Sequence, residues 1–286
     1  MPVLYVVATP IGNLQDMTPR AIDILRKVAF IAAEDTRVTM KLLQVFDIHT
    51  PLTSCHRHNE LEKGAYLAER MLTENVDAAL TTDAGTPGIS DPGYGMVQAA
   101  LARGIEVVPV PGCCAAVAAL SVCGFDTREF AFYGFLPREK KALTERLLEI
   151  GRGPKIAVIH ESPFRIQDLI AAVCEVLPDA MLSVSCDLTK LHELTLHGTP
   201  AEILNALRNN EKSDRGEYCV VMDLHGIPAE TPKECTASVS LEAKLLEELL
   251  AGRDLRGAQE ALFTAGEKKN AVKAAALNLK KVLQEL

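Results

Sequence analysis

Four short segments combine turn-forming residues with side chains that could bind a polar ligand. They are Thr9–Asn13, Glu34–Arg37, Asp83–Pro87 and Pro111–Cys114. Each follows an apolar run that is predicted as a strand, and open α/β sheets bind ligands at the carboxyl ends of their strands. We therefore expect these segments to meet at one binding site. The alternative is four tight turns that serve only the fold.

The segment Asp83–Pro87 offers a carboxylate, a glycine and a hydroxyl within five residues. Gly85 would let the backbone approach a ligand closely, and the polar groups suit a ligand with ribose and amino-acid parts. The segment Glu34–Arg37 carries three charges and a hydroxyl. It is either the N-terminal cap of a helix, or a cluster in which an arginine beside carboxylates binds a phosphate.

Further charged residues follow predicted strands in the second half of the sequence. Glu161, Arg165 and Lys190 could each face the same site, although surface ion pairs would also explain them. His56 and His58 alternate in a polar stretch, but two histidines alone make a weak metal site. We predict no metal, and we assign this stretch to a loop or to substrate contact.

Short β-branched runs alternate with helical patterns, which indicates an α/β fold. The predicted strands are Val3–Ala8, Phe30–Ala33, Val76–Thr82, Ile105–Val110, Lys155–His160, Met181–Asp187, Glu193–His197 and Glu217–Leu224, and the crossover between the two halves is placed at Phe130–Phe135. The predicted helices are Thr18–Val28, Thr39–Phe46, Glu60–Glu74, Tyr94–Arg103, Ala115–Cys123, Leu143–Ile150, Pro163–Leu177, Pro200–Asn209, Ser240–Ala251, Leu255–Thr264 and Lys269–Leu286. Thr18 is expected to cap its helix, with Pro19 in the first turn.

The order of these elements predicts three domains. Residues 1–112 should form a mostly parallel sheet with helices. Residues 113–226 should form a mixed sheet, because two strands joined only by Leu188–His192 imply a hairpin. Residues Gly226–Ser238 have the composition of a linker. Residues 239–286 should form a small helical domain.

The chain has 286 residues, with 38 acidic and 30 basic side chains and a formal net charge of −8. This balance argues against a protein that coats nucleic acid through bulk positive charge. The C-terminal end is locally basic, since five lysines follow Glu267: Lys268, Lys269, Lys273, Lys280 and Lys281. They form either the solvated face of an amphipathic helix or a local surface for RNA.

Several common site motifs are absent from the sequence. It has no GxxxxGK[ST] loop and no GxSxG elbow, which leaves P-loop phosphoryl transfer and the usual α/β-hydrolase nucleophile without support. A dinucleotide fold would show GxGxxG after the first strand, where Thr9–Asn13 has one glycine and a proline. The sequence therefore predicts a different class of ligand site.

The eight cysteines are scattered through apolar runs without a CxxC pair, and we interpret them as reduced core residues of a cytoplasmic protein. The N-terminal stretch lacks the basic region of a signal peptide. The longest apolar run, Cys113–Cys123, is too short to cross a bilayer, so we expect no membrane association.

Five strings in order along the sequence resemble the ribosomal RNA small subunit methyltransferase I family, which has the tetrapyrrole methylase fold. They are Thr9–Arg20, Ala33–Arg37, His58–Glu60, Asp83–Pro87 and Leu188–Lys190. The resemblance covers nearly the whole sequence, and the TPIGNLxDxTxRA and DAGTP strings are specific. It implies a two-domain α/β enzyme, usually a homodimer, that binds S-adenosylmethionine between its domains. It also implies methyl transfer to the ribose 2'-hydroxyl of a decoding-centre cytidine in 16S rRNA of the 30S subunit.

By position, the resemblance implies three cofactor loops and two groups of functional side chains. The loops hold Pro10, Ile11 and Gly12; Asp83, Ala84, Gly85, Thr86 and Pro87; and Cys114 and Ala115. Glu161 or Asp35 is the candidate proton acceptor, and Lys190 or Arg37 would stabilise negative charge on the ribose oxygen. Predicted RNA contacts are His58, Asn59, Arg165, Lys268, Lys269 and Lys273, the lysines lying in a helix-turn-helix-like appendage.

The sequence departs from the family pattern at three places. Thr82 replaces a serine, and His160–Arg165 reads HESPFR where YESPHR is usual. Cys186-Asp187 replaces an Arg-Glu pair, which removes one expected cation. Two other functions stay open: methylation of a small tetrapyrrole, and a catalytically silent RNA-binding protein of ribosome assembly.

Overall fold

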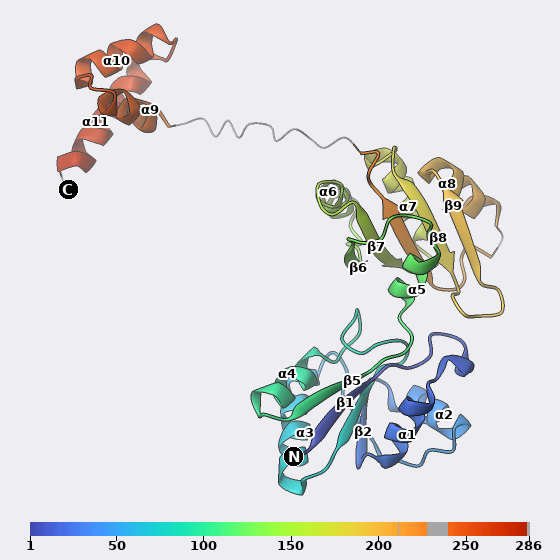
Figure 1. Ribbon diagram of the computed structural model, residues 1–286. Helices are drawn as coiled ribbons and strands as arrows, with labels where there is room; N and C mark the ends of the chain where they lie inside the picture. Colours follow the sequence, from blue (N-terminus) through green and yellow to red (C-terminus); the bar gives the residue numbers. More distant parts are fainter. Residues whose placement is uncertain (211, 228–239, 285–286) are drawn as a thin grey trace. The chain divides into compact units, whose positions relative to one another are not determined.

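The computed structural model describes residues 1–210, 212–227 and 240–284 (Figure 1). The chain divides into two compact units, Met1–Pro228 and Ala229–Leu286. The first unit contains two five-stranded sheets and the second contains three helices. Most of the predicted linker Gly226–Ser238 lies outside the described residues.

The first sheet is parallel throughout, in the order β3-β2-β4-β1-β5. Its strands are β1 (Val3–Val7), β2 (Phe30–Ala33), β3 (Leu52–Ser54), β4 (Ala78–Thr81) and β5 (Glu106–Val110). The prediction of a mostly parallel sheet is confirmed. The edge strand β3 was not predicted, because three residues after a proline are too few to show a strand pattern.

Two pairs of helices cover the two faces of this sheet. They are α1 (Pro19–Lys27) and α2 (Thr36–Val45) on one face, and α3 (Glu60–Glu74) and α4 (Tyr94–Ala102) on the other. The N-cap prediction for α1 is confirmed, since the Thr18 hydroxyl accepts a hydrogen bond from the backbone N–H of Ala21. The connection that follows β1 runs to β2, on one side in the sheet, and the connection that follows β4 runs to β5, on the other side. The direction of the strand order therefore reverses between the neighbours β1 and β4. That reversal opens a crevice at the carboxyl ends of these two strands.

The second sheet is mixed, in the order β6-β7-β10-β8-β9. Its strands are β6 (Ala131–Phe135), β7 (Ile156–Glu161), β8 (Met181–Cys186), β9 (Leu194–Gly198) and β10 (Tyr218–Asp223). Only β6 and β7 pair in parallel, and β8 and β9 form the predicted hairpin. Strand β10 runs antiparallel to both its neighbours, so its first residue, Tyr218, lies opposite Glu161 and Cys186.

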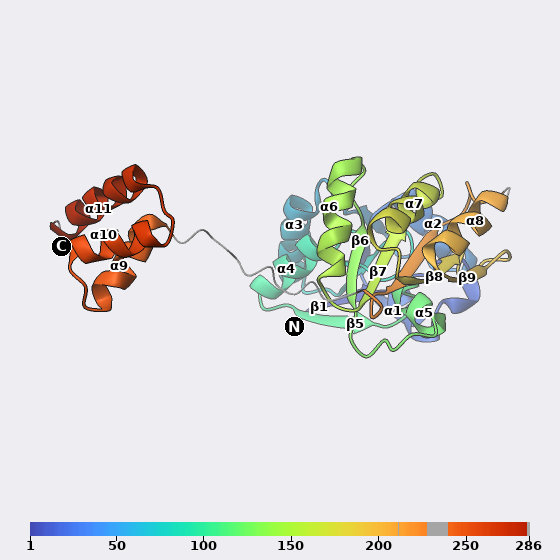
Figure 2. The ribbon, with the colours of Figure 1, turned by 90° about the horizontal axis from the view of Figure 1, so that it is seen from above.

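Helices also cover both faces of the mixed sheet (Figure 2). They are α5 (Ala115–Val122) on one face, and α6 (Lys140–Gly151), α7 (Ile166–Val176) and α8 (Pro200–Asn209) on the other. Helix α7 begins at Ile166 and not at the predicted Pro163, because Ser162 starts a turn in which its carbonyl accepts from the backbone N–H of Arg165. Most other predicted elements differ from the structure by only a few residues at their ends.

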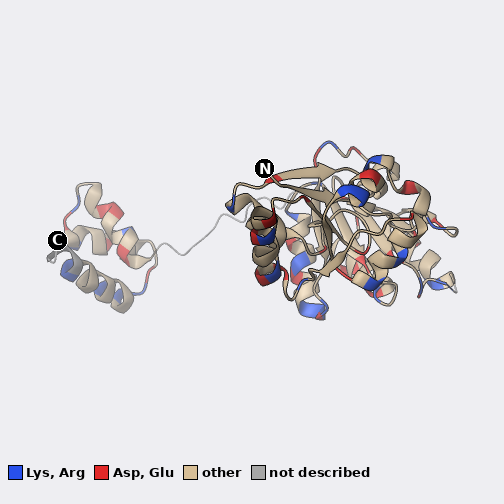
Figure 3. Ribbon diagram, turned by 90° about the horizontal axis from the view of Figure 1, so that it is seen from below, with Lys and Arg blue, Asp and Glu red and all other residues tan. Residues whose placement is uncertain are grey.

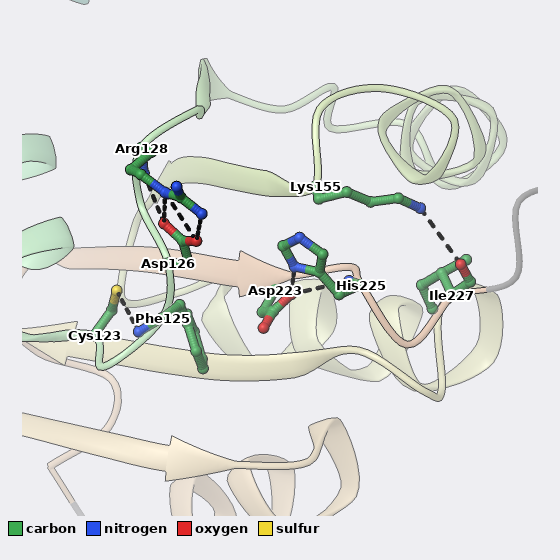
Figure 4. A network of polar contacts seen from close by, with 8 residues as sticks. All are labelled: Cys123, Phe125, Asp126, Arg128, Lys155, Asp223, His225 and Ile227. Atoms are coloured by element: carbon green, nitrogen blue, oxygen red, sulfur yellow. Dashed lines mark hydrogen bonds and ion pairs between the residues drawn. The ribbon is translucent and has the colours of Figure 1, made fainter.

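The end of β10 far from Tyr218 carries a group of short-range polar contacts (Figure 4). Asp126 and Arg128 form one ion pair there, and Asp223 and His225 form another. The Arg128 guanidinium holds the pKa of Asp126 at about 2. Lys155 donates to the carbonyl of Ile227 at 3.4 Å, where the chain leaves the sheet. These contacts are local and lie at the end of the sheet opposite the one that Glu161 occupies.

The second unit is a bundle of α9 (Leu241–Leu250), α10 (Leu255–Thr264) and α11 (Lys269–Gln284) around Leu245, Leu262 and Val272. The prediction of three helices is confirmed; residues 285–286 of the predicted last helix lie outside the described residues. The lysines of α11 are exposed. Figure 3 marks basic positions along this helix in blue. Among all described helices, none is both long enough and apolar enough to span a membrane. Each of the seven cysteines in the described ranges is a free thiol.

Candidate functional site

A cavity of about 590 Å³ lies at the carboxyl ends of β1 and β4 and is closed by residues of the mixed sheet. The first sheet contributes Ile11, Glu34, Asp83, Ala84, Gly85, Thr86, Ile89, Ser90 and Asp91. The segment after β5 contributes Cys114 and Ala115, and the mixed sheet contributes Phe135, His160, Glu161, Ser162, Pro163, Leu188, Gly216, Glu217, Tyr218 and Cys219. Most residues assigned to the three predicted loops therefore line one cavity.

The loops after β1, β4 and β5 are joined by direct hydrogen bonds. Thr9 and Gly85 exchange two backbone hydrogen bonds, at 2.9 and 3.0 Å. The Thr86 hydroxyl donates to the carbonyl of Cys113 at 2.9 Å. Gly85 has a φ of +79°, which side chains other than glycine rarely adopt. The three loops thus form one rigid wall of the cavity. The buried Pro87 lies behind this wall and does not line it.

Gly12 is the point where the first loop meets the mixed sheet. A Cβ atom at this position would lie 2.5 Å from Cγ of Lys190 and 3.0 Å from the hydroxyl of Thr189. Only a glycine therefore lets the Lys190 side chain lie across this loop. Pro10 and Gly12 line a second, smaller groove on the other side of the loop.

Three carboxyl groups of the first half face the cavity: Glu34, Asp83 and Asp91. Burial raises the pKa of each of them, and nearby carboxylates raise each pKa further. Glu34 accepts from the backbone N–H of Asp83 at 3.3 Å, and Asp83 accepts from that of Asp35 at 3.1 Å. The cavity thus presents partly desolvated carboxylates, a surface that favours a cationic ligand.

Glu161 is the most buried acidic residue of the cavity, with a side chain that is 1% exposed. Its Oε1 accepts from the backbone N–H of Ser162 at 2.7 Å. Its Oε2 makes no hydrogen bond within the described structure and lies 3.4 Å from the guanidinium of Arg165. Arg165 also donates to the carbonyl of Pro137 at 2.9 Å. The arginine therefore orients Glu161, whose buried Oε2 has no hydrogen-bond partner among the described residues.

His160 lies beside Glu161 on β7. Its ring packs edge-on against Phe132 and Phe135, with ring centres 5.0 and 5.8 Å away. Burial lowers the pKa of His160, so the ring is neutral near pH 7. Its buried Nε2 has no hydrogen-bond partner among the residues that the structure describes. This atom offers the cavity a neutral polar contact.

Lys190 lies between two carboxylates. Its ammonium donates to Asp187 at 2.8 Å and to Glu217 at 3.1 Å. Burial lowers the pKa of Lys190, but these two hydrogen bonds outweigh burial and raise it. Lys190 does not line the cavity itself, although its partner Glu217 does. Where this chain has Cys186-Asp187, the family usually has an arginine followed by an acidic residue. The acidic residue is kept here as Asp187, and it is a partner of Lys190.

Asp35 and Arg37 do not line the cavity. Asp35 caps α2 by accepting from the backbone N–H of Arg37 at 2.8 Å, and the two side chains form an ion pair at 2.6 Å. This pair lowers the pKa of Asp35 to about 2. Of the two interpretations of Glu34–Arg37, the helix cap is the one that the structure contains, although Glu34 itself faces the cavity.

The predicted contact residues His58 and Asn59 lie in the loop before α3. Asn59 accepts from the backbone N–H of His56 at 2.8 Å, and the rings of His56 and His58 are 6.0 Å apart. Arg57 donates to the carbonyl of Ser90, a cavity residue, at 2.7 Å. The loop is thus attached to the cavity wall. Within the described ranges, no three His, Cys, Asp or Glu side chains are grouped so as to hold a metal ion.

Sequence reasoning missed several cavity residues, above all Glu217 and Tyr218. They precede or begin a strand, whereas the prediction considered residues that follow strands. The signal that could have found them is the hairpin at Leu188–His192, because it requires antiparallel strands that begin where others end. Lys268, Lys269 and Lys273 are exposed in the second unit.

The chain matches the family model of Tetrapyrrole (Corrin/Porphyrin) Methylases over residues 3–204. A protein of Pseudomonas aeruginosa named ribosomal RNA small subunit methyltransferase I is 42% identical over 89% of each chain. Its namesake from Halalkalibacterium halodurans is 44% identical over 81% of this chain and 78% of the other. A crystal structure of diphthine synthase, 13% identical, shares the fold with a TM-score of 0.59 over 78% of this chain and 90% of the other. The chain therefore belongs to the tetrapyrrole methylases and, among them, to the ribosomal RNA small subunit methyltransferase I family.

Proposed function

We propose that this protein transfers a methyl group from S-adenosylmethionine to the ribose 2'-hydroxyl of a decoding-centre cytidine in 16S rRNA. Relatives that are 42–44% identical over most of the chain carry the name of an rRNA methyltransferase. The observation that carries the chemistry is the meeting of the Asp83–Pro87 loop and the buried Glu161 at one cavity. The first can bind a cofactor and the second can accept a proton.

The cavity fits S-adenosylmethionine in charge and in shape. The cofactor carries a sulfonium and an ammonium group, which the carboxylates of Glu34, Asp83 and Asp91 would attract. Ala115 and Cys219 offer apolar walls for the adenine ring; burial raises the pKa of the Cys219 thiol to about 12, so it stays neutral. When bound, the cofactor supplies an electrophilic methyl group on sulfur. Ile11, Ala84, Gly85, Thr86 and Cys114 are the further cavity residues that we propose hold it, and Pro10, Gly12 and Pro87 would fix the conformation of the loops that present them.

Glu161 is the proton acceptor in this proposal. A ribose hydroxyl is a weak nucleophile until it loses its proton. Oε2 of Glu161 would accept that proton, and the cofactor, when bound, would supply the methyl group to the ribose oxygen. Arg165 lies 3.4 Å from this oxygen and orients the carboxylate. Asp35, the other candidate, is held by Arg37 outside the cavity lining, which favours Glu161.

Lys190 is the candidate cation for the charge that develops on the ribose oxygen, with Arg37 as the alternative. Lys190 lies over Gly12, beside the cofactor loop, whereas Arg37 is exposed and paired with Asp35. We therefore propose Lys190, in preference to Arg37, as the cation that stabilises negative charge on the ribose oxygen. Its two carboxylate partners orient the ammonium but also neutralise part of its charge.

The RNA substrate requires cations, and several described residues could supply them. We propose that Lys268, Lys269 and Lys273 contact rRNA phosphates from the helical domain, and that His58, Asn59 and Arg165 contact RNA near the cavity. Replacing the three lysines by glutamine should weaken binding to 30S subunits and lower its salt dependence. Equal affinity at every salt concentration would contradict this role.

We also propose three domains, residues 1–112, 113–226 and 239–286, in a cytoplasmic homodimer. The family resemblance supports the dimer. So do exposed apolar side chains on α4 and α5, among them Leu101, Val117 and Val122, which are 60%, 58% and 49% exposed. We propose a cytoplasmic location because the bacterial 30S subunit, the proposed substrate, is in the cytoplasm.

The deciding experiment offers labelled S-adenosylmethionine to 30S subunits, naked 16S rRNA and a tetrapyrrole in parallel. We expect label in rRNA, recovered as 2'-O-methylcytidine after digestion to nucleosides. Label in a methylated base would refute the ribose as acceptor. Label only in the tetrapyrrole would support the alternative enzyme, and label in none would support a silent RNA-binding protein.

A further inference from the structure

A second hollow of about 300 Å³ lies beside the cavity, on the other side of the first cofactor loop. Its walls are Pro10 and Gly12 from that loop, Leu14 from the short helix η1 (Leu14–Asp16), Asp83, and four residues of α2. Those four are Val38, Lys41, Leu42 and Val45, which the spacing i, i+3, i+4 and i+7 places on one helix face. We call this hollow the α2 groove.

The α2 groove adjoins the cavity. Asp83 lines both, and the loop residue Ile11 faces the cavity while its neighbours Pro10 and Gly12 face the groove. A ligand in the groove would therefore be separated from one in the cavity by a single turn of chain. Such an arrangement suits two reactants that must meet.

The apolar side chains in the walls of the α2 groove are exposed to solvent. Leu14, Val38 and Val45 are 45%, 40% and 59% exposed, a high exposure for side chains that gather on one hollow. Apolar side chains of this kind can stack against the flat face of a nucleobase. The volume is at the low end for a small-molecule site, which suits a single nucleoside.

The groove has two charged groups, and they have opposite signs. Lys41 is exposed and can bind a phosphate. Asp83 uses Oδ1 to accept from the backbone N–H of Asp35, and Oδ2 accepts no hydrogen bond within the described parts of the chain. A carboxylate oxygen accepts hydrogen bonds and so selects a base with an exocyclic amino group, such as cytosine, over one with a carbonyl there, such as uracil.

We propose that the α2 groove binds the base of the target nucleotide, an amino-bearing pyrimidine, between Leu14 and the exposed face of α2. Asp83 accepts from the amino group and Lys41 binds the neighbouring phosphate. This inference rests on the proposed function. It adds to it a means of choosing cytidine, and it gives Asp83 contacts on both sides of the first loop.

The first test fills the groove. Val38→Phe should lower kcat/KM for 30S subunits about tenfold or more, because the larger ring takes the space of the base, and it should leave the Kd for S-adenosylmethionine unchanged. Met40→Phe is the matched control, since Met40 is 50% exposed on the same helix but does not line the groove. A Val38→Phe variant as active as Met40→Phe would overturn the proposal. So would a weakened cofactor affinity, which would make the groove part of the cofactor site.

The second test asks whether Asp83 reads the base. Subunits that carry uridine in place of the target cytidine should be methylated poorly by the wild-type protein. Asp83→Asn can donate to the uracil carbonyl, and we expect it to reduce the preference for cytidine about 5- to 150-fold, whatever it does to the absolute rate. An unchanged ratio would overturn the assignment. If the wild-type protein methylates no rRNA at all, the proposed function fails and the groove proposal fails with it; if only the variants disagree, the groove proposal fails alone.

Discussion

The two sheets of the first unit bring residues to the same cavity by different geometric rules. In the parallel sheet, the cavity residues follow the carboxyl ends of strands, as Asp83 follows β4. In the mixed sheet, β7 ends at the cavity with Glu161 while β10 begins there with Tyr218, because the two residues are antiparallel partners. The side of a parallel sheet that faces a cavity presents only the C-terminal ends of its strands. The same side of an antiparallel sheet presents C-terminal ends and N-terminal beginnings alternately.

The two sheets also differ in the groups that they present. The parallel half presents loops joined through backbone hydrogen bonds, including the Thr9–Gly85 pair, and carboxyl groups with raised pKa values. The mixed half presents individual side chains held by packing and ion pairs, with the buried Glu161 and the partly buried His160 among its polar members. We therefore expect the parallel half to control cofactor affinity and the mixed half to control turnover.

The largest effect should come from Glu161→Gln. The amide keeps the volume of the side chain and the hydrogen bond from Ser162 but cannot accept a proton. We expect kcat to fall about 10²- to 10⁴-fold, the usual contribution of a general base. The Kd for S-adenosylmethionine, measured by calorimetry, should change little.

Glu217→Gln is the control for Glu161→Gln, since it makes the same change at another cavity carboxylate of the mixed half. Glu217 is paired with Lys190 and its side chain is 76% exposed, so we expect a much smaller loss. If Glu217→Gln abolished turnover and Glu161→Gln did not, the base would have to be reassigned.

Gly85→Ala should weaken the cofactor affinity of the parallel half. An alanine at a φ of +79° costs about 1–2 kcal/mol, and its methyl group would enter the cavity wall. We expect the Kd for S-adenosylmethionine to rise about 5- to 30-fold, with kcat at saturation nearly kept.

Gly88 offers a matched control for Gly85, because it has a φ of +80° in the same loop without lining the cavity. Gly88→Ala should destabilise the fold to a similar degree and leave the cofactor affinity unchanged. If both variants lost affinity equally, loop strain alone would explain the result and the assignment of Gly85 to the cofactor wall would be wrong.

The parallel half was also the more predictable from sequence. A strand followed by a glycine-containing turn places Asp83–Pro87 correctly, because in a parallel sheet the position along the chain fixes the edge at which a residue lies. Glu217 escaped prediction because its place depends on which strands pair with β10, and pairing partners cannot be read from local pattern. The β3 strand escaped for a simpler reason, since three residues carry no periodicity.

Charged residues near strand ends show a second limit of the sequence. The pattern of Glu34–Arg37 allows both a helix cap and a ligand site, and the structure divides the segment between these roles. Asp35 caps α2 and pairs with Arg37, whereas Glu34 faces the cavity. Neighbouring carboxylates differ in this way because successive residues at a helix start point in different directions. Composition alone cannot say which one turns inward.

The contact between the two halves can be measured with Gly12→Ala and Lys190→Ala. The new Cβ would lie 2.5 Å from Cγ of Lys190, so Gly12→Ala alone should displace the lysine from Asp187 and Glu217. Combined with Lys190→Ala, most of the clash disappears. We expect the two changes in unfolding free energy to be non-additive by about 1 kcal/mol, measured by chemical denaturation.

Lys190→Ala on its own also tests the proposed role in charge stabilisation. If its turnover equals that of the wild-type protein, Lys190 leaves the mechanism and serves only to hold the two halves together. Additive free energies in the double variant would instead mean that Gly12 and Lys190 are not in contact in solution.

The smallest expected effect is a change of cofactor affinity with pH. It distinguishes the titratable groups of the parallel half from those of the mixed half. Burial raises the pKa values of Glu34, Asp83 and Asp91 above those of the unfolded chain, about 4. Between the unfolded and the raised pKa values, the folded protein without ligand therefore binds more protons than the unfolded chain. The stability that these groups contribute at low pH is lost as pH rises through their raised pKa values. A cationic cofactor prefers the ionised carboxylates, so its affinity should change in the opposite sense and increase a few-fold as pH rises through the raised pKa values of the three carboxyl groups.

Calorimetric titration of S-adenosylmethionine across this range would measure the change, and Asp91→Asn should make the profile flatter. Asp126→Asn is the control, because the Arg128 guanidinium holds the pKa of Asp126 at about 2, so it stays ionised throughout. Burial lowers the pKa of His160, so a His160 variant tests whether this ring contributes to the profile. A pH profile that Asp91→Asn leaves unchanged and a His160 variant abolishes would assign the titration to the mixed half, and the division between a binding half and a reacting half would then be wrong.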